Sequence, residues 1–384
     1  MPELAFRTKV VGPSKIEESL RIMEQRKDII SLGAGEPDFP APKVVVDAAN
    51  KFLKKGFTHY APLQGKKELR EAISEKLKKE NKIDATPDEI IITTGSKEAI
   101  LLSVLTLVNP KEEVIIPNPG YLAYRPVVEM LGGIPVDLKL REEDGFEVNC
   151  EELKKLISKK TKLLIINTPS NPTGNVLNKK TLEEIADIVV DKDIFVLVDE
   201  AYEKLTYENT KHISLASLNG MFDYAITTQT FSKSYAMCGF RVGYAVAKKE
   251  IIKEMKEFKL ATTISAPTAY QLAAVEALKK CRNYVEKMRK EYDRRRKMIC
   301  KRLSEIPGVR FNMPKGAFYV FPNIEAFNMR SKKFVDFIFE KAKVIIVAGT
   351  EFGKYGEGFV RLSYATAYEK IEEAMNRIEK VLKS

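Results

Sequence analysis

Residues 225–244 of the chain, AITTQTFSKSYAMCGFRVGY, give the clearest indication of how the protein is organised. Two apolar runs, Ala225–Thr230 and Val242–Ala247, are predicted strands. Between them lies a single lysine, Lys233, among aromatic and other apolar residues. Such neighbours should partly desolvate the amine. Desolvation lowers the pKa of an ammonium group and frees its nitrogen to act as a nucleophile.

Arg241 follows Lys233 by eight residues and can bind a phosphate group through two parallel hydrogen bonds. An amine that can form an imine, next to a phosphate anchor, suggests pyridoxal 5'-phosphate (PLP) as the cofactor. A surface lysine beside an ordinary arginine is the alternative, and the spacing alone favours it. The full pattern S-K-x-x-x-x-x-G-x-R-x-G, however, resembles the lysine signature of class I aminotransferases, which are PLP enzymes of fold type I.

Length and composition predict a soluble protein of two domains. The chain has 384 residues, of which 44% are hydrophobic and 30% charged. No run of about 18 apolar residues is present, so no membrane span is expected, and the N-terminus lacks the apolar core of a signal peptide. The four cysteines show no CxxC spacing, which is typical of free thiols in a reducing cytoplasm. We therefore expect a cytoplasmic protein.

The net charge of +11 raises the question of a nucleic-acid partner. Much of the charge lies in Lys279–Arg302, which has twelve Lys or Arg against three Asp or Glu. Apolar residues in this region recur at helical spacing, so we favour an amphipathic helix with a basic solvated face and expect no nucleic acid. These apolar residues are Val285, Met288, Tyr292, Ile299 and Leu303. With only two histidines, a His-centred metal site or a Ser-His-Asp triad is not expected.

The N-terminal part is expected to be an arm that leads into a helix, Ile16–Gln25, followed by the irregular segment S-L-G-A-G-E-P-D-F at 31–39. The glycines and proline are consistent with a plain turn. The resemblance to class I aminotransferases implies instead that this segment lines the substrate pocket, where Gly35 offers its backbone to the substrate carboxylate. We also consider Lys15 as a residue that could bind a second, distal carboxylate of the substrate.

A loop, T-H-Y-A-P-L-Q-G at 58–65, precedes a helix predicted at Lys67–Glu80. In the family that the chain resembles, the tyrosine matching Tyr60 reaches across a homodimer to the PLP phosphate of the neighbouring subunit. A tyrosine packed within its own loop is the alternative.

The segment I-I-I-T-T-G-S-K at 90–97 is a predicted strand and glycine turn before a helix at Glu98–Val108. The free N–H groups and the positive dipole end of a helix N-terminus favour anions. Gly95, Ser96 and Lys97 are therefore candidates for a phosphate-binding cup, although many turns between a strand and a helix contain glycine.

Two further predicted strands, Val114–Ile116 and Leu163–Asn167, end in proline-rich turns. Tyr121, in N-P-G-Y, matches the aromatic that stacks on the cofactor ring in the family, but it is also compatible with a core tyrosine. Asn171, in S-N-P-T-G, could donate to the phenolate oxygen of the cofactor and face the substrate carboxylate. A type I or II turn explains the same residues.

The run I-F-V-L-V-D-E-A-Y at 194–202 is a predicted buried strand that ends in an acid. Ligands bind at the carboxyl ends of such strands. A buried Asp199 needs a cationic partner, and a protonated pyridine nitrogen would be one. A helix cap or an ordinary salt bridge is the alternative. Tyr202 could hydrogen-bond the phenolate oxygen of the cofactor.

The C-terminal part differs in composition from the rest. We expect a hairpin of Val309–Met313 with Phe318–Phe321, and an arginine, Arg361, in the middle of a strand at 358–364. A buried arginine requires an anion. The resemblance implies that Arg361 binds the α-carboxylate of the substrate, and a structural salt bridge is the alternative. The other expected elements are helices at Lys249–Phe258, Thr268–Lys280, Lys333–Lys341 and Glu369–Leu382 and a strand at Val344–Val347.

These motifs occur in family order over nearly the whole chain, and they resemble the aspartate/aromatic branch of class I aminotransferases. The fold implied is α/β: a three-layer PLP-transferase fold with a mostly parallel central sheet, plus a smaller α+β domain built from both chain ends. The alternation of strands and helices from residue 90 to 247 supports this independently. We expect an arm and part of the small domain at 1–45, the large PLP-binding domain at 46–280 and the small domain at 281–384. The resemblance also places Thr230 and Ser232 at the cofactor, although the family usually has Ser or Gly at position 230.

The function implied is ping-pong transfer of an amino group from an L-amino acid to 2-oxoglutarate, in a homodimer with shared active sites. Lys233 would act as the general base, assisted by Asp199 and Tyr202. Aspartate and aromatic amino acids are the expected donors. Alanine, diaminopimelate or a β-lyase reaction on the same cofactor remain open. A PLP-sensing regulator would need an additional DNA-binding segment, and none is expected before residue 31.

Overall fold

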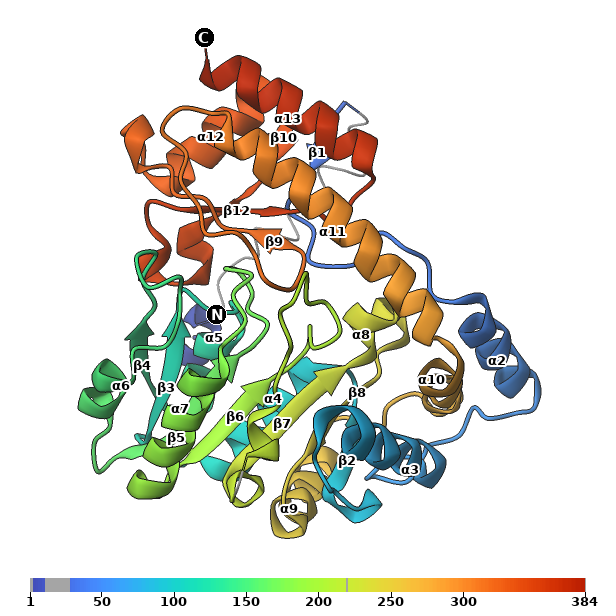
Figure 1. Ribbon diagram of the computed structural model, residues 1–384. Coiled ribbons are helices and arrows are strands. Elements are labelled where there is room, and N and C mark those ends of the chain that lie inside the picture. Colours follow the sequence, from blue (N-terminus) through green and yellow to red (C-terminus); the bar gives the residue numbers. More distant parts are fainter. Residues whose placement is uncertain (1–2, 11–27, 219, 384) are drawn as a thin grey trace.

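A seven-stranded sheet forms the centre of the molecule, with its strands in the order β2-β8-β7-β6-β5-β3-β4 (Figure 1). The computed structural model describes residues 3–10, 28–218 and 220–383. Neighbouring strands are parallel from β7 to β4, whereas β8 is antiparallel to both of its neighbours. The mostly parallel sheet expected from the sequence is thus confirmed. Its strands are β2 (Ile90–Thr93), β3 (Glu113–Asn118), β4 (Ile134–Lys139), β5 (Thr161–Asn167), β6 (Phe195–Asp199), β7 (Ala225–Thr230) and β8 (Gly243–Val246).

Alternate residues of these strands enter two different hydrophobic cores, because successive side chains of a strand point to opposite faces. In β2, for example, Ile92 lies in one core and Ile91 in the other. Both faces of the sheet are therefore covered by helices. One layer contains α2 (Lys43–Lys54), α3 (Lys67–Lys76), α6 (Cys150–Leu156), α7 (Lys179–Lys192) and α10 (Thr268–Lys280). The other contains α4 (Ser96–Leu107), α5 (Tyr124–Met130) and α9 (Lys249–Leu260).

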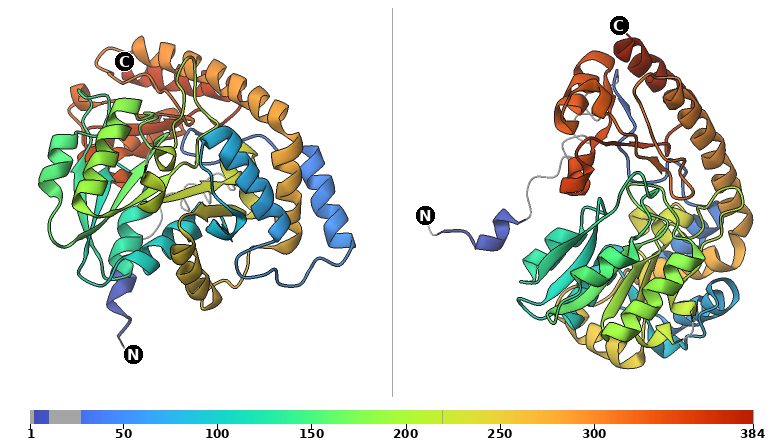
Figure 2. Two further views of the ribbon diagram at one scale, coloured as in Figure 1. Left: turned by 60° about the horizontal axis from the view of Figure 1, so that its bottom comes forward. Right: turned by 60° about the vertical axis from the view of Figure 1, so that its left-hand side comes forward.

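A second, smaller part lies beyond one end of the large sheet, where it is coloured orange and red in Figures 1 and 2. It has its own hydrophobic core. Its first sheet joins both ends of the chain, because β1 (Ile30–Ser31) pairs in parallel with β10 (Val344–Ile345). Its second sheet is antiparallel, in the order β11-β12-β9. The remaining elements are β9 (Tyr319–Val320), β11 (Val347–Ala348), β12 (Val360–Ser363), α12 (Ser331–Ala342) and α13 (Tyr368–Leu382).

The long helix α11 (Arg282–Ser304) runs from α10, beside the large sheet, up to this smaller part (Figure 1). Its predicted apolar face is confirmed, since all five residues named for it are buried. Its basic face is only partly solvated. Arg295 is buried in ion pairs with Asp38 and Glu291, and Arg296 likewise with Glu208 and Asp293.

Two predictions of secondary structure differ from the structure, and a third falls outside the described residues. The hairpin of Val309–Met313 with Phe318–Phe321 is wrong: β9 pairs with β12 instead, and the earlier segment forms only an isolated bridge between Arg310 and Asn323. The strand expected at Val344–Val347 is split, because its two halves pair with different partners, β1 and β12. The helix at 16–25 and Lys15 lie outside the described residues.

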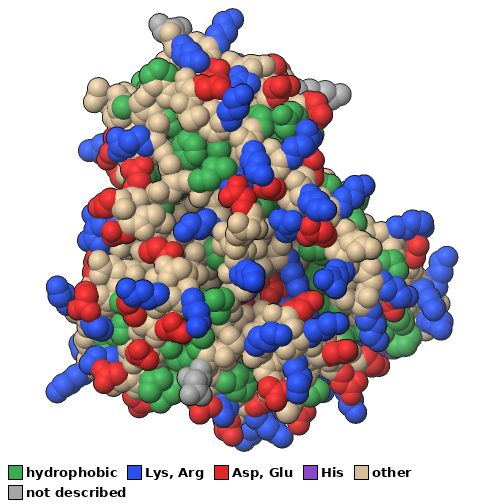
Figure 3. All heavy atoms as spheres, in the orientation of Figure 1, with side chains coloured by type: hydrophobic (Ala, Val, Ile, Leu, Met, Phe, Trp, Pro, Cys, Tyr) green, Lys and Arg blue, Asp and Glu red, His purple; other side chains and the backbone are tan. Residues whose placement is uncertain are grey.

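Basic side chains do not gather into one patch on the face drawn in Figure 3, where Lys and Arg are interspersed with Asp and Glu. Many of these charges form ion pairs one helical turn apart, such as Arg294 with Glu291 and Lys297 with Asp293. A mixed surface of this kind lacks the continuous basic stripe typical of nucleic-acid binding. In the described part of the chain, no helix combines the length and the apolar character needed to cross a membrane.

Candidate active site

The candidate site lies where parallel strands of the large sheet end. Asn167 closes β5, Asp199 closes β6 and Thr230 closes β7. Asn167 and Asp199 are register partners across β5 and β6, so the ends of these strands lie side by side. The carboxyl edge of a parallel sheet is the usual ligand site in α/β proteins, because the turns that follow the strands leave polar groups there.

Lys233 lies on α8 (Phe231–Ser234), the short helix that begins directly after β7. Its Nζ donates a hydrogen bond to the carbonyl oxygen of Gly35 at 2.5 Å, which brings the 31–39 segment to the sheet edge. Burial lowers the pKa of the Lys233 ammonium. The positive charges of Arg361 and Arg241 lower it further, although Cys238 and Glu36 oppose them. The neutral, nucleophilic form of the amine is therefore favoured.

Asp199 is buried and accepts a hydrogen bond from the hydroxyl of Tyr124 at 2.8 Å and one from the backbone N–H of Ala201 at 3.1 Å. Burial raises the pKa of this carboxyl to about 6, despite these two donors and the nearby ammonium of Lys233. Among the described residues, no Lys, Arg or His lies within 4.0 Å of the carboxylate. A cation placed against Asp199 would thus restore its charged form.

Gly95 and Arg241 meet at the N-terminus of α4. Arg241 donates to the carbonyl oxygens of Thr94 and Cys238, both at 2.9 Å. A Cβ atom on Gly95 would lie 2.6 Å from the nearer guanidinium nitrogen of Arg241, and the backbone of Gly95 has a φ of +84°. Glycine is thus required both for the turn and for the close approach. No side chain caps α4, so its first N–H groups, from Ser96 onward, are available to an anion.

The two hydroxyl residues predicted at the cofactor also lie here. Thr230 caps α8 by accepting from the backbone N–H of Ser232, and the two side-chain oxygens are 3.0 Å apart. Lys97 is exposed at the start of α4, with its ammonium 6.0 Å from the centre of the Tyr121 ring. The predicted phosphate cup is therefore a physical cluster of glycine, hydroxyl and cationic groups.

Arg361 is the most deeply buried cation of the site, with 1% of its surface exposed. One guanidinium nitrogen donates to the side-chain oxygen of Asn171 at 3.0 Å, and another donates to the carbonyl oxygen of Gly33 at 2.7 Å. The Nε atom has no partner, and no described acid lies within 4.0 Å of the group. Burial lowers the pKa of Arg361 because no neighbouring anion compensates its charge.

Tyr202 and Tyr121 complete the cluster from two sides. The hydroxyl of Tyr202 lies 2.8 Å from that of Tyr319, and both residues are buried. Tyr121 packs edge-on against Tyr124, with ring centres 5.4 Å apart, which places it beside the partner of Asp199. Burial raises the pKa of Tyr121, and the charges of Asp199, Arg241 and Arg361 all act on this phenol. Asp199, Arg241 and Arg361 thus lie near Tyr121.

Tyr60 is the exception among the predicted residues. It has 78% of its surface exposed, and none of the contacts described in the chain joins it to Lys233, Asp199 or Arg361. Its position is compatible with the predicted role toward a second subunit, which this single chain does not test.

The residues present fit PLP. The ring-nitrogen end of the cofactor matches the uncompensated carboxyl of Asp199, and its phosphate matches the uncapped α4 terminus with Arg241. Its aldehyde matches the lowered pKa of Lys233. The free Nε of Arg361 matches a carboxylate on a substrate. In the described part of the chain, Lys233, Asp199 and Arg361 form no ion pair, and the Nε of Arg361 also has no hydrogen-bond partner.

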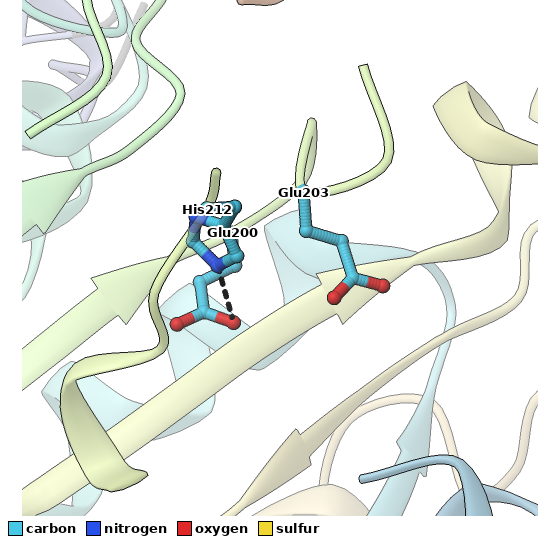
Figure 4. A group of neighbouring side chains, drawn as sticks. All are labelled: Glu200, Glu203 and His212. Carbon is cyan, nitrogen blue, oxygen red and sulfur yellow. Dashed lines mark ion pairs between the residues drawn. The ribbon is translucent and has the colours of Figure 1, made fainter. Parts of the chain in front are cut away.

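A buried polar network lies directly behind Asp199. Within the described ranges, Glu200, Glu203 and His212 form a group close enough to hold a metal ion (Figure 4). His212 and Glu200 point toward each other at 3.2 Å, and the ammonium of Lys76 already contacts Glu203. Lys76 also donates to Asn81 and Gln229. Lys76 therefore compensates the charge of Glu203, while Glu200 pairs with His212.

Sequence reasoning missed Tyr124, Tyr319 and Phe352. Tyr124 binds Asp199, while the rings of Tyr319 and Phe352 lie 4.4 Å and 4.9 Å from the Arg361 guanidinium carbon. Tyr124 follows Tyr121 by three residues, so a second polar aromatic in the same turn was a weak signal. For Tyr319 and Phe352 no sequence signal distinguishes them from core aromatics.

Known proteins resemble this chain in sequence and in structure. A family model described as aminotransferase class I and II matches residues 27–378. The aspartate aminotransferase of Pyrococcus abyssi is 49% identical over 383 residues, which are 99% of this chain and 98% of that protein. The aromatic-amino-acid aminotransferase 2 of Thermococcus litoralis is 47% identical over 383 residues, again 99% and 98% of the two chains. Among solved structures, an aromatic aminotransferase from Pyrococcus horikoshii has a TM-score of 0.91 and 50% identity, covering 95% of this chain and 98% of that one.

Proposed function

Because the chain belongs to the class I and II aminotransferase family, and is therefore a PLP-dependent aminotransferase, we propose that it transfers the amino group of aspartate or an aromatic L-amino acid to 2-oxoglutarate. The observation that carries this proposal is the convergence of Lys233, Asp199 and Arg361 in one site, each without an ion pair among the described residues. Three uncompensated charges in one place favour a ligand that carries the opposite charges.

The bound cofactor supplies an aldehyde that accepts the amino group and a ring that delocalises the electron pair left at the substrate Cα. Lys233 first holds the cofactor through Nζ. With an amino acid bound in its place, the free amine would remove the proton from the substrate Cα, and its lowered pKa would favour the neutral form that acts as a base. The carbonyl oxygen of Gly35 orients Nζ during this transfer.

Asp199 would keep the ring nitrogen of the cofactor protonated, with Tyr124 and Ala201 fixing its carboxylate. Arg361 binds the substrate α-carboxylate, with Asn171 and Gly33 fixing its guanidinium. Tyr202 would donate to the phenolate oxygen of the cofactor and Tyr121 would contact its ring. The phosphate would be held by the group of Gly95, Ser96, Lys97, Thr230, Ser232 and Arg241.

The reaction is ping-pong: the first substrate leaves as a 2-oxo acid before 2-oxoglutarate enters and leaves as glutamate. Relatives of nearly equal identity are named for aspartate and for aromatic amino acids, so both donors are tested side by side. The working unit is a homodimer in which Tyr60 of each subunit, exposed in the single chain, binds the phosphate in the other subunit's site.

The proposal is tested by a screen of the twenty amino acids against 2-oxoglutarate with purified, PLP-loaded protein. Aspartate or an aromatic donor should give the highest rate, with one glutamate formed per 2-oxo acid released. Ammonia release without glutamate would point to a β-lyase instead. The Lys233→Ala variant should lose about 10²- to 10⁴-fold in rate, whereas the exposed Lys211→Ala serves as its control. Repeated turnover by Lys233→Ala at a near-normal rate would contradict the assignment.

A further inference from the structure

Tyr319 occupies a position that the proposed chemistry has not used. It lies in β9, is fully buried, and pairs with Ser363 of β12, the strand that carries Arg361. A Cβ atom on Gly35 would lie 3.5 Å from its hydroxyl, so it also borders the segment whose carbonyl binds Lys233. The Tyr319 side chain thus lies between the strand that carries Arg361 and the segment that contacts Lys233.

The hydroxyl of Tyr319 makes its described hydrogen bond to the hydroxyl of Tyr202, at 2.8 Å. Either oxygen can be the donor. If Tyr319 donates, the proton of Tyr202 stays available for a second acceptor, and Tyr202 becomes a stronger donor because its oxygen is polarised. Burial raises the pKa of both phenols, so both remain protonated at neutral pH.

The ring of Tyr319 faces Arg361, with the guanidinium carbon 4.4 Å from the ring centre. This distance is that of a desolvated cation–π contact. Phe352 makes a second such contact, at 4.9 Å. The two rings stabilise a buried guanidinium that has no carboxylate partner among the described residues, and they restrict how it can turn.

We propose that Tyr319 is a positioning residue that serves both halves of the reaction: its hydroxyl strengthens Tyr202 as a donor to the phenolate oxygen of PLP, and its ring holds Arg361 for the substrate carboxylate. This inference rests on the proposed function, since it assigns Tyr202 and Arg361 to cofactor and substrate. Tyr319 contacts Tyr202 through its hydroxyl and Arg361 through its ring. It acts through two residues that lie on different elements.

A consequence follows for the colour of the holoenzyme. A donor to the phenolate oxygen withdraws negative charge that would otherwise stabilise the adjacent protonated imine nitrogen, and therefore lowers the pH at which the cofactor absorbance changes. Removing the Tyr319 hydroxyl should raise that midpoint, because Tyr202 becomes a weaker donor. The ring that faces Arg361 is retained in phenylalanine, so carboxylate binding should change little.

The first test is a spectrophotometric pH titration of PLP-loaded wild type, Tyr319→Phe, Tyr202→Phe and the double variant. We expect Tyr319→Phe to raise the midpoint by about half to one pH unit. Tyr202→Phe should raise it further, and adding Tyr319→Phe to it should have no effect. Tyr364→Phe removes another buried hydroxyl of the smaller part and should leave the midpoint unchanged. An unchanged midpoint in Tyr319→Phe, or a full further shift in the double variant, overturns the role of the hydroxyl.

The second test measures the dissociation constant of an unreactive carboxylate, succinate or 3-phenylpropionate, from the absorbance of the bound cofactor. Tyr319→Phe should bind it within about twofold of wild type, whereas Tyr319→Leu should bind it about 3- to 10-fold more weakly. Equal affinity in Tyr319→Leu overturns the role of the ring. Melting of the cofactor-free variants shows whether Tyr319→Leu is folded, and if it is not, Tyr319→Met replaces it.

The wild type and Tyr202→Phe test the proposed function, whereas Tyr319→Phe tests the role of Tyr319. If wild-type protein binds no PLP, or if Tyr202→Phe leaves its titration unchanged, the function or the role of Tyr202 is wrong and the inference falls with it. If wild type and Tyr202→Phe behave as expected and only Tyr319→Phe is silent, the function stands and Tyr319 is merely a core residue.

Discussion

The three charged side chains at the centre of the site are costly for the fold. Asp199 and Arg361 are buried and Lys233 is partly buried, yet none of them forms an ion pair with a described residue. Burial shifts the pKa of each toward its neutral form. Buried charges without partners destabilise the fold, and a ligand of opposite charge would compensate them. Their cost in stability is therefore consistent with a role in binding and catalysis.

Replacing Arg361 with lysine tests the carboxylate site at the scale of one residue. Arg361→Lys keeps the charge but loses the planar fork that Asn171 and Gly33 hold in place. We expect KM for the amino acid to rise about 10- to 100-fold, the loss that follows from one charge-assisted bidentate contact. Steady-state kinetics measure it, with the partly exposed Arg377→Lys as the control. An unchanged KM would show that the carboxylate binds elsewhere.

At the scale of elements, the site is made by the connections that follow the strands. β2 delivers Gly95 to α4, β7 delivers Lys233 to α8, and the turn after β5 delivers Asn171. Each connection is short, so the end of its strand determines where the functional group lies. Packing of the sheet between two helix layers then holds the groups of separate connections in one arrangement.

Gly95→Ala tests the turn between β2 and α4. A methyl group there would lie 2.6 Å from the Arg241 guanidinium and would force it away from the α4 terminus. We expect the Kd for PLP to rise at least about tenfold. Stability should fall by roughly 1–3 kcal/mol, because the φ of 84° and ψ of 168° at Gly95 are a conformation that other residues rarely adopt. Gly56→Ala is a matched control, because Gly56 has a φ of +81° and open space around it. It should lose similar stability without any loss of PLP affinity. Equal PLP affinities in the two variants would remove Gly95 and Arg241 from the phosphate site.

The buried network that joins α3 to the ends of β6 and β7 predicts a pH dependence of stability. Burial alone would raise the pKa of Glu203, but the ammonium groups of Lys76 and Lys204 outweigh it and lower the pKa from 4.5 to about 2. The folded state therefore holds the charged form, so the stabilisation is complete above pH 4.5 and is lost as the pH falls toward 2. Burial lowers the pKa of Lys76, so its desolvation offsets part of this stabilisation.

Urea unfolding of wild type and Glu203→Gln between pH 7 and pH 2.5 measures this contribution. The stability difference should be largest at neutral pH and should shrink below about pH 4.5. Glu183→Gln, which removes an acid from an exposed pair with Lys179, should show no such pH dependence. A difference between wild type and Glu203→Gln that is constant over this range would show that the ion pair is not what stabilises the network.

At the scale of the whole molecule, the site lies between two parts of the chain. Asp199 ends a strand of the large sheet and Lys233 lies on α8 directly after another, whereas Arg361 and Tyr319 come from the smaller part. The hydrogen bond from Arg361 to Asn171 connects the two parts. The N-terminal segment joins both, since Gly33 contacts Arg361 and Gly35 contacts Lys233. The limits of the two domains, at 45/46 and 280/281, stay predictions.

The exposed Tyr60 leads to a prediction about assembly. If it binds the phosphate in the partner subunit's site, Tyr60→Phe should weaken PLP binding about 3- to 30-fold without changing Lys233. Mixed dimers of Tyr60→Phe with Lys233→Ala should then contain one site with both native residues. At limiting PLP, subunit exchange should give more activity than either parent alone. A monomer in sedimentation experiments, or no gain after confirmed exchange, would contradict the shared site.

The local elements, and the motifs that directly follow them, could be predicted from the amino-acid sequence alone. The runs at 90–97, 194–202 and 225–244 are continuous stretches in which a strand, its turn and its functional residue are covalently linked, so spacing alone predicts where Gly95, Asp199 and Lys233 lie on their elements. The positions of Lys233 and Arg361 relative to each other came only from resemblance, since 128 residues separate them in the chain.

Contacts between residues far apart in the sequence could be identified only in the folded protein. The segment 309–313 has the alternation of a strand, but β12 pairs with β9 instead and leaves it out of the sheet. Arg295 and Arg296 belong to a basic run, yet both are buried and form ion pairs with acidic residues. Tyr319 resembles any core aromatic until Tyr202 and Arg361 are placed against it. Pairing and burial depend on contacts between residues far apart in sequence, and hydrophobic periodicity carries no information about those contacts.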